Sequence, residues 1–173
     1  MHTELELPGV HIFSYEKNVD SRGHFERVYN EEDLDALGLN TKWPHHNSSF
    51  NMRAGTIRGL HYQLEPSVED KFVRCISGAI YEVLLDLRPD SSHYLKWISL
   101  NLLADESMGL YIPGGVAHGF QTLKDETTVS YLNSIIYDPS GQSGINPVHS
   151  ATDFRWPLEI TVISERDLAL PKI

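Results

Sequence analysis

The sequence has little cysteine, few basic residues and no long apolar run. Its 173 residues include one cysteine, Cys75, which excludes an intrachain disulfide framework. The 14 Lys and Arg residues against 24 Asp and Glu residues leave a formal net charge of −10, which argues against a general nucleic-acid-binding surface. The apolar runs are too short to span a membrane, and the N-terminal segment lacks the basic and apolar regions of a signal peptide. We therefore expect a cytoplasmic protein with no nucleic-acid or membrane partner.

Apolar and polar residues alternate in many short segments. Over residues 80–88, four apolar side chains share one face, and the ionisable Glu82 and Asp86 lie on the other. This pattern predicts a strand that packs through one face and lines a pocket with the other. Further strands are expected over residues 25–29, 56–63, 71–76, 94–102, 109–112, 119–123 and 127–131. Many short strands between Gly, Pro and Asp turns are typical of a β-sandwich or barrel.

Helical signals are few. Asn30 precedes three acidic residues and an apolar pair at helical spacing, which predicts one short capped helix. A second helical turn is expected at 164–168, with Ser164 as its cap. Since no repeat or flexible linker divides the chain, we expect one all-β domain over residues 1–173, with one or two short helices.

Two segments carry a histidine on an expected strand. Taken alone, His61 in the segment Arg58 to Gln63 and His118 in the segment Pro113 to Phe120 are more often structural than functional. Together the segments resemble the paired motifs of the cupin superfamily, a double-stranded β-helix or jelly roll whose pocket both motifs line. The second motif, Pro-x-Gly-x-x-His, is intact, whereas the first has Gln63 two residues after its histidine and lacks the usual glutamate. Two histidines without a third ligand make a poor transition-metal site, so we expect a metal-free pocket.

A longer series of blocks carries a more specific resemblance. In chain order they are Asp20-Ser21-Arg22-Gly23-His24-Phe25, Asn47-Ser48-Ser49, Ile57 to Gln63, Lys71, Asp86-Leu87-Arg88, Ile112 to Phe120, Tyr131, Trp156-Pro157 and Ser164 to Asp167. This series resembles the dTDP-4-dehydrorhamnose 3,5-epimerase family over nearly the whole chain. The resemblance implies epimerisation at C3 and C5 of a nucleoside-diphosphate 4-keto-6-deoxyhexose without any cofactor, converting dTDP-4-dehydro-6-deoxyglucose to dTDP-4-dehydrorhamnose. It also implies a homodimer in which N-terminal strands pair across the interface and one subunit helps to bind the other's nucleotide.

Matching the family residue by residue implies the reacting groups. His61 matches the general base and Asp167 its orienting carboxylate, while Tyr131 matches the acid that returns a proton to the opposite face. Lys71 matches the lysine beside the C4 oxygen. A ketone at C4 acidifies the hydrogens on both neighbouring carbons, so this set suits deprotonation to an enolate and reprotonation. Asp86 is expected to hold Lys71 or a neighbour, with a strand-end carboxylate paired to Arg88 as the alternative.

The same matching implies the substrate-binding groups. Arg22 and Arg58 match the pyrophosphate-binding arginines, whose guanidinium fork fits phosphate oxygens. The other members of the expected binding set are Asn47, His118, Phe25, Gln63, Asp86, His45 and Arg27. Arg27 and His45 depart from the family in segments that meet the nucleotide, and residues 146–150 and Leu132 depart elsewhere.

Two alternatives stay open at this point. One is an epimerase that inverts C3 or C5 alone, on a GDP-, CDP- or dTDP-linked 4-keto sugar. The other is a nonenzymatic cupin that binds a nucleotide sugar. Such a binding protein needs the arginines but no acid and base, so the presence of both argues against it.

Overall fold

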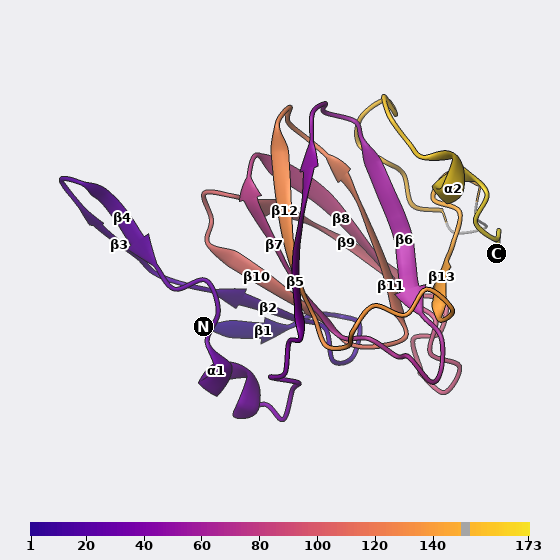
Figure 1. Cartoon of the computed structure of the whole chain (residues 1–173), viewed down its shortest axis with the longest axis horizontal. Coiled ribbons are helices and arrows are strands. Elements are labelled where there is room, and N and C mark those ends of the chain that lie inside the picture. The colour runs from indigo at the N-terminus through magenta and orange to yellow at the C-terminus, as the bar shows by residue number, and fades with distance from the viewer. Residues whose placement is uncertain (150–152) are drawn as a thin grey trace.

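The computed structural model describes residues 1–149 and 153–173 and contains two facing antiparallel sheets (Figure 1). The first sheet has the order β1-β2-β10-β7-β12-β5, and the second has the order β13-β6-β11-β8-β9. The strands of the first sheet are β1 (His2–Glu4), β2 (His11–Ser14), β5 (His45–Asn51), β7 (Lys71–Ser77), β10 (Met108–Ile112) and β12 (Thr127–Asn133). Those of the second are β6 (Ile57–Gln63), β8 (Ala79–Asp86), β9 (Trp97–Leu103), β11 (Val116–Thr122) and β13 (Gln142–Gly144).

Apolar side chains from both sheets meet between them and form the main core. Val73 and Val129 of the first sheet and Leu84 and Phe120 of the second are at most 1% exposed. Burying such side chains contributes about 1.5 to 3 kcal/mol each, so this interface holds the two sheets together. The all-β class expected from the sequence is confirmed.

The strands expected between residues 56 and 131 are present, with ends shifted by up to three residues. Both faces of β8 are covered, however, which corrects the expectation that one face lines a pocket. One face packs through Val83 and Leu85 against the segment that follows β13. The other points between the sheets, where Glu82 and Asp86 are 0% exposed.

A two-stranded hairpin of β3 (Lys17–Asp20) and β4 (Gly23–Glu26) projects away from both sheets (Figure 1). The strand expected over 25–29 therefore ends earlier, at Glu26. The hairpin leads into α1 (Glu31–Asp35), where Asn30 occupies the N-cap position but makes no capping hydrogen bond with its side chain. The N-terminal end of the helix is stabilised instead by its acidic first turn, because negative side chains interact favourably with the helix dipole there.

The second helix, α2 (Glu165–Leu168), lies beside β6 near the C-terminus (Figure 1). Its cap is the one expected, because the Ser164 hydroxyl oxygen accepts a hydrogen bond from the Asp167 backbone N–H at 3.0 Å. Neither helix of the described ranges is long and apolar enough to cross a membrane.

Candidate active site

A cavity of about 510 Å³ is lined by residues of both sheets. It brings together nine of the residues expected from the sequence: His45, Asn47, Arg58, His61, Gln63, Lys71, His118, Tyr131 and Asp167. Strand pairing explains the gathering, because His61 lies opposite His118 in the β6–β11 pair and Asn47 lies opposite Tyr131 in the β5–β12 pair. The histidines thus reach the cavity from one sheet, and Tyr131 reaches it from the other.

His61 and Asp167 are directly bonded, with 2.7 Å between Nε2 of His61 and Oδ1 of Asp167. The other carboxylate oxygen accepts a hydrogen bond from the Gly59 N–H at 3.2 Å. Burial alone raises the pKa of Asp167, but the hydrogen bond and charge of His61, with the Gly59 and Ser164 hydrogen bonds, outweigh it and hold the pKa below its ordinary value. Because the ionised carboxylate can only accept, Nε2 of His61 carries the shared hydrogen, and in the neutral form of the imidazole Nδ1 then holds the lone pair.

Gly59 allows β6 to approach β11 closely next to the His61–Asp167 pair. Its φ is +101°, and a Cβ at this position would lie 2.6 Å from the His118 carbonyl oxygen and 2.8 Å from Gly119 Cα. Neither the backbone conformation nor the space admits a side chain. A glycine is therefore needed here, two residues before His61.

Tyr131 faces the histidines from the opposite sheet. Its ring centroid lies 6.3 Å from that of His118, and its hydroxyl lies 2.8 Å from Ser49 Oγ. Burial raises the pKa of the Tyr131 hydroxyl more than the Ser49 hydrogen bond lowers it. The phenol therefore keeps its hydrogen at neutral pH and suits donation to a strong base such as an enolate.

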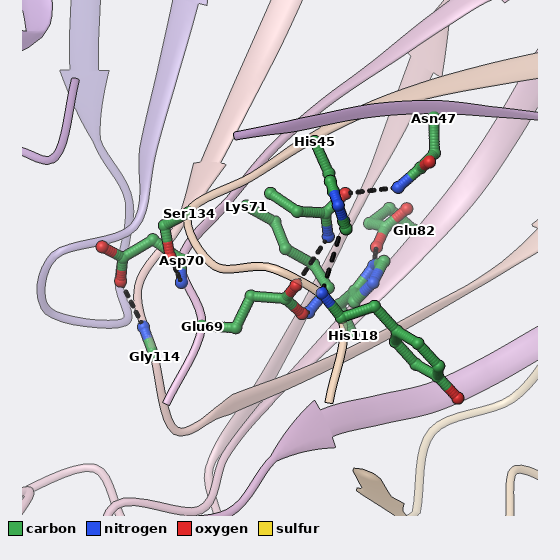
Figure 2. Close-up of polar contacts among 11 residues, drawn as sticks. His45, Asn47, Glu69, Asp70, Lys71, Glu82, Gly114, His118 and Ser134 are labelled. Carbon is green, nitrogen blue, oxygen red and sulfur yellow. Dashed lines mark hydrogen bonds and ion pairs between the residues drawn. The ribbon is translucent and has the colours of Figure 1, made fainter. Parts of the chain in front are cut away.

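Lys71 begins β7 and points toward Glu69 in the cavity wall (Figure 2). One carboxylate oxygen of Glu69 accepts a hydrogen bond from Lys71 Nζ, and the other accepts one from Asn133 Nδ2 at 2.9 Å. The next residue, Asp70, accepts a hydrogen bond from the Gly114 N–H at 2.8 Å (Figure 2). This bond ties the glycine turn before β11 to the start of β7.

Asp86 does not hold Lys71, which corrects that expectation. Its carboxylate accepts hydrogen bonds from Arg88 Nε at 2.9 Å and Nη2 at 2.6 Å, and from the Ser91 hydroxyl at 2.7 Å. It does not line the cavity. Arg88 follows Asp86 by two residues, so the alternative of a strand-end carboxylate paired with Arg88 is what the structure contains.

His118 and Glu82 form a buried pair next to Lys71 (Figure 2). Nδ1 of His118 lies 2.8 Å from Oε1 of Glu82, and the side chains are 7% and 0% exposed. Burial raises the pKa of Glu82 well above its ordinary value. Burial, with the nearby charges of Lys71 and His61, lowers the pKa of His118 well below its own. Both shifts favour the neutral forms, so His118 presents a polar but uncharged ring to the cavity, and Glu82 lies behind it.

Three more expected residues line the cavity. Arg58 Nε donates a hydrogen bond to Asn51 Oδ1 at 2.7 Å, which fixes the direction of its guanidinium. Gln63 is 6% exposed, and its Oε1 has no hydrogen-bond partner within the described part of the chain. The Tyr137 N–H donates to His45 Nδ1 at 3.3 Å.

Arg22, Phe25 and Arg27 lie outside this cavity. Arg22 and Phe25 belong to the projecting hairpin, where Arg22 pairs with Asp20 at 2.5 Å, and Arg27 follows β4 on the surface. The departing stretch 146–150 also lies outside the cavity over 146–149, while Ser150 falls beyond the described residues. Asn146 of this stretch donates to the Leu168 carbonyl oxygen at 2.6 Å and so fastens α2.

The cavity wall also includes Glu69, Asn133 and Gln142, which lie outside every sequence block described above. Asn133 follows Tyr131 by two residues, so strand alternation places it on the same face. Glu69 and Gln142 carry no such signal, because the segments around them show no alternation. Arg166 adds a cation beside Asp167.

No group of three His, Cys, Asp or Glu side chains that could hold a metal ion occurs within residues 1–149 and 153–173. His61 and His118 each have one ring nitrogen bonded to a carboxyl group. The site as built therefore offers acid, base and cationic groups around a small cavity.

Comparisons with known proteins agree with this arrangement. Residues 4–173 match the family model described as dTDP-4-dehydrorhamnose 3,5-epimerase. A relative of that name from Sinorhizobium fredii (strain NBRC 101917 / NGR234) is 35% identical over 170 residues, which are 98% of this chain and 87% of the relative.

Two solved structures extend the likeness to the fold. The dTDP-4-dehydrorhamnose 3,5-epimerase from Bacillus anthracis str. Ames, with TDP and PPi bound, superposes with a TM-score of 0.95 at 33% identity and covers 100% of both chains. ChmJ, a 3'-monoepimerase from Streptomyces bikiniensis in complex with dTDP-quinovose, superposes with a TM-score of 0.90 at 27% identity and covers 97% of this chain and 85% of its own. The fold and the epimerase activity expected from the sequence are confirmed, and the chain belongs to the dTDP-4-dehydrorhamnose 3,5-epimerase family.

Proposed function

We propose that the cavity epimerises a dTDP-linked 4-keto-6-deoxyhexose at C3 and C5, with His61 as the base and Tyr131 as the acid. The observation that carries this assignment is the placement of His61 and Tyr131 on facing sheets around one cavity. Inversion requires that a proton leave one face of the sugar and return to the other. A base and an acid on opposite walls meet that requirement.

Nδ1 of His61 takes the proton from the carbon next to the ketone, and the electron pair of the C–H bond moves into an enolate. The imidazolium that forms is stabilised by the ionised Asp167 at 2.7 Å. Asp167 also fixes the ring orientation, because it is itself held by Gly59 and by the turn of α2. A general base of this kind contributes about 10²–10⁴-fold to the rate.

Lys71 supports the negative charge that develops on the C4 oxygen. A cation placed in advance where charge develops contributes more to the transition state than to the neutral ketone. Tyr131 then gives its hydrogen to the enolate carbon from the opposite face. Because burial raises the pKa of Tyr131, the phenol is in its protonated form when the enolate appears.

Arg58 and Arg166 are the cations that line the cavity besides Lys71, and they suit the diphosphate. Their local charge allows a protein with a net charge of −10 to bind an anionic nucleotide. Asn47 and Gln63 supply amide groups for the sugar or the base.

The projecting hairpin supports a homodimer in which Arg22 and Phe25 reach a second subunit's cavity. An isolated two-stranded hairpin is marginally stable in water, and this one exposes Val19 at 76% and Phe25 at 70%. Exposed apolar side chains beside an arginine are typical of a surface that a protein partner and an anionic ligand cover. The hairpin is therefore where the second subunit's contribution to nucleotide binding belongs.

Inversion at a single carbon is the second candidate. It is favoured by one observation, the likeness to a 3'-monoepimerase at a TM-score of 0.90. The two candidates share the base, the acid and the lysine, and they differ only in how many carbons present their hydrogen to His61.

Incubation with dTDP-4-dehydro-6-deoxyglucose in deuterated water tests the proposal. We expect deuterium at both C3 and C5, seen by NMR, without any added cofactor. Deuterium at one carbon indicates the monoepimerase, and no incorporation with any of the dTDP-, UDP-, GDP- and CDP-linked 4-keto sugars contradicts the enzyme assignment.

A further inference from the structure

Lys71 is held by a carboxylate that has no part in the proton transfers. We propose that Glu69 is a positioning residue, which fixes the ammonium group of Lys71 at the cavity wall and is fixed in turn by Asn133. This inference rests on the proposed role of Lys71. Glu82, the other carboxyl group near Lys71, is occupied by His118.

The contact between Glu69 and Lys71 is largely shielded from water. The Glu69 side chain is 8% exposed and the Lys71 side chain is 11% exposed, and both line the cavity. Lysine has a long side chain with a large rotamer entropy, so strand position alone leaves its ammonium free to occupy several places. A buried ion pair with a fixed partner selects one of them.

Glu69 is itself held on its second oxygen. Asn133 lies opposite Lys71 in the β12–β7 pair and donates its amide hydrogen to Glu69 Oε1 at 2.9 Å. The Asn133 side-chain oxygen accepts a hydrogen bond from Asn47 Nδ2 at 3.1 Å. These bonds link Glu69 to three neighbouring strands, β5, β12 and β7, so the carboxylate is a fixed point and not a mobile counter-ion.

The sign of the charge indicates what Glu69 does. A carboxylate beside Lys71 offsets part of the positive charge that an enolate oxygen needs, so Glu69 does not strengthen the electrostatic stabilisation itself. Its contribution is to fix the position of the ammonium group. One of the three N–H donors binds Glu69, and the others remain free to bind the C4 oxygen. A displacement of about 1 Å in such a group costs up to about 10²-fold in rate.

A double-mutant cycle tests this inference, because it asks whether Glu69 acts through Lys71. The variants are Glu69→Ala, Lys71→Ala and both together, and the measurement is the rate of deuterium incorporation into dTDP-4-dehydro-6-deoxyglucose. We expect Glu69→Ala to lower the rate about 10- to 100-fold in the wild-type background. In the Lys71→Ala background we expect the same change to alter the rate by less than about twofold, because no ammonium is left to position.

A conservative variant and a matched control complete the test. Glu69→Gln keeps one oxygen that accepts from Lys71 and gives up only the bond from Asn133, so we expect it to retain the rate within about fivefold. Arg88→Gln breaks a second ion pair between residues two apart, Asp86 and Arg88, outside the cavity. We expect it to leave the exchange rate unchanged while it lowers the melting temperature.

The possible failures are distinguishable. Two results overturn the positioning role and leave the epimerase mechanism standing. One is a double variant whose rate falls by the product of the two single-variant factors. The other is a folded Glu69→Ala variant that keeps the wild-type rate. A Lys71→Ala variant that keeps the wild-type rate overturns the proposed role of Lys71, and the inference with it. The dissociation constant of dTDP, measured on each variant by calorimetry, should stay within about threefold of wild type, because Glu69 contacts Lys71 and not the arginines.

Discussion

Asp167 Oδ1 lies 2.7 Å from Nε2 of His61, although the two residues are 106 positions apart in the chain. Three local features produce this contact. Ser164 caps the short α2, Asn146 fastens its end through the Leu168 carbonyl, and Gly59 offers a backbone N–H to the second carboxylate oxygen. The pair is therefore positioned by the C-terminal segment as much as by β6.

Asp167→Asn should lower the rate of hydrogen exchange by about 10²–10⁴-fold. The amide can still accept a hydrogen bond from His61, but it carries no charge to stabilise the imidazolium. Deuterium incorporation measured by NMR tests this, with circular dichroism to show that the variant is folded. A rate within a few-fold of wild type would show that the carboxylate charge is not needed.

The same variant should change the acid stability. Because the pKa of Asp167 is lower in the folded protein than in the unfolded chain, the ionised carboxylate stabilises the fold above about pH 3.9, the value of an unfolded aspartate. That contribution is lost as the pH falls through the lower folded value. The free energy of unfolding, measured with urea at pH 7 and pH 3, should therefore fall less on acidification for Asp167→Asn than for wild type. An equal fall in both proteins would contradict the linkage.

Tyr131→Phe should impair net inversion more than it impairs exchange at the first carbon. The enolate can still form, and protonated His61 can return a proton to the original face. The test compares deuterium incorporation with product formation in one NMR time course. Equal loss of both signals would indicate that Tyr131 positions the substrate instead of protonating it.

Gly59→Ala should destabilise the fold and disturb the dyad. The new Cβ meets the His118 carbonyl oxygen at 2.6 Å, and the φ of +101° is unfavourable for alanine, so overpacking and strain together cost about 2–5 kcal/mol. Gly38→Ala is the matched control, since Gly38 has a φ of +68° but open space around it. The melting temperature of Gly59→Ala should be well below that of Gly38→Ala. Equal melting temperatures would show that the close approach of β6 and β11 does not require a glycine at position 59.

Arg22→Ala should weaken the binding of dTDP, UDP, GDP and CDP by a similar factor. Arg22 is 88% exposed on the hairpin of its own chain, so an effect on binding requires that it reach a second subunit's nucleotide. A phosphate contact does not depend on the base, so the four factors should agree, and calorimetry measures them. Unchanged affinities would remove the hairpin from the binding site, and a loss confined to dTDP would assign Arg22 to the base.

The sequence predicted the parts of the fold that follow regular patterns. The two histidine segments lie on paired strands, as their motifs require, and Ser164 caps the second helix. Strand β5 was not predicted because His45–Asn51 is mostly polar and partly exposed, so it shows no alternation of apolar residues. Its polar residues are there because they form part of the cavity wall.

The partner of Lys71 could not be read from the sequence. Asp86 and Glu69 are both acidic residues near the expected site, and only the three-dimensional arrangement separates them. Arg88 shares the strand end with Asp86 and occupies its carboxylate, whereas Glu69 lies in an irregular connection whose path no periodicity describes. Side chains from such connections are the part of a site that sequence patterns miss.

The role of His61 as the base is most directly tested by His61→Asn, assayed by deuterium incorporation into dTDP-4-dehydro-6-deoxyglucose. The variant keeps a polar side chain next to Asp167 but has no group that can accept a proton from carbon. We predict that the folded variant loses exchange at both C3 and C5 by at least about 10²–10⁴-fold. Exchange at a near-wild-type rate in a folded His61→Asn protein would contradict the assignment of His61 as the base.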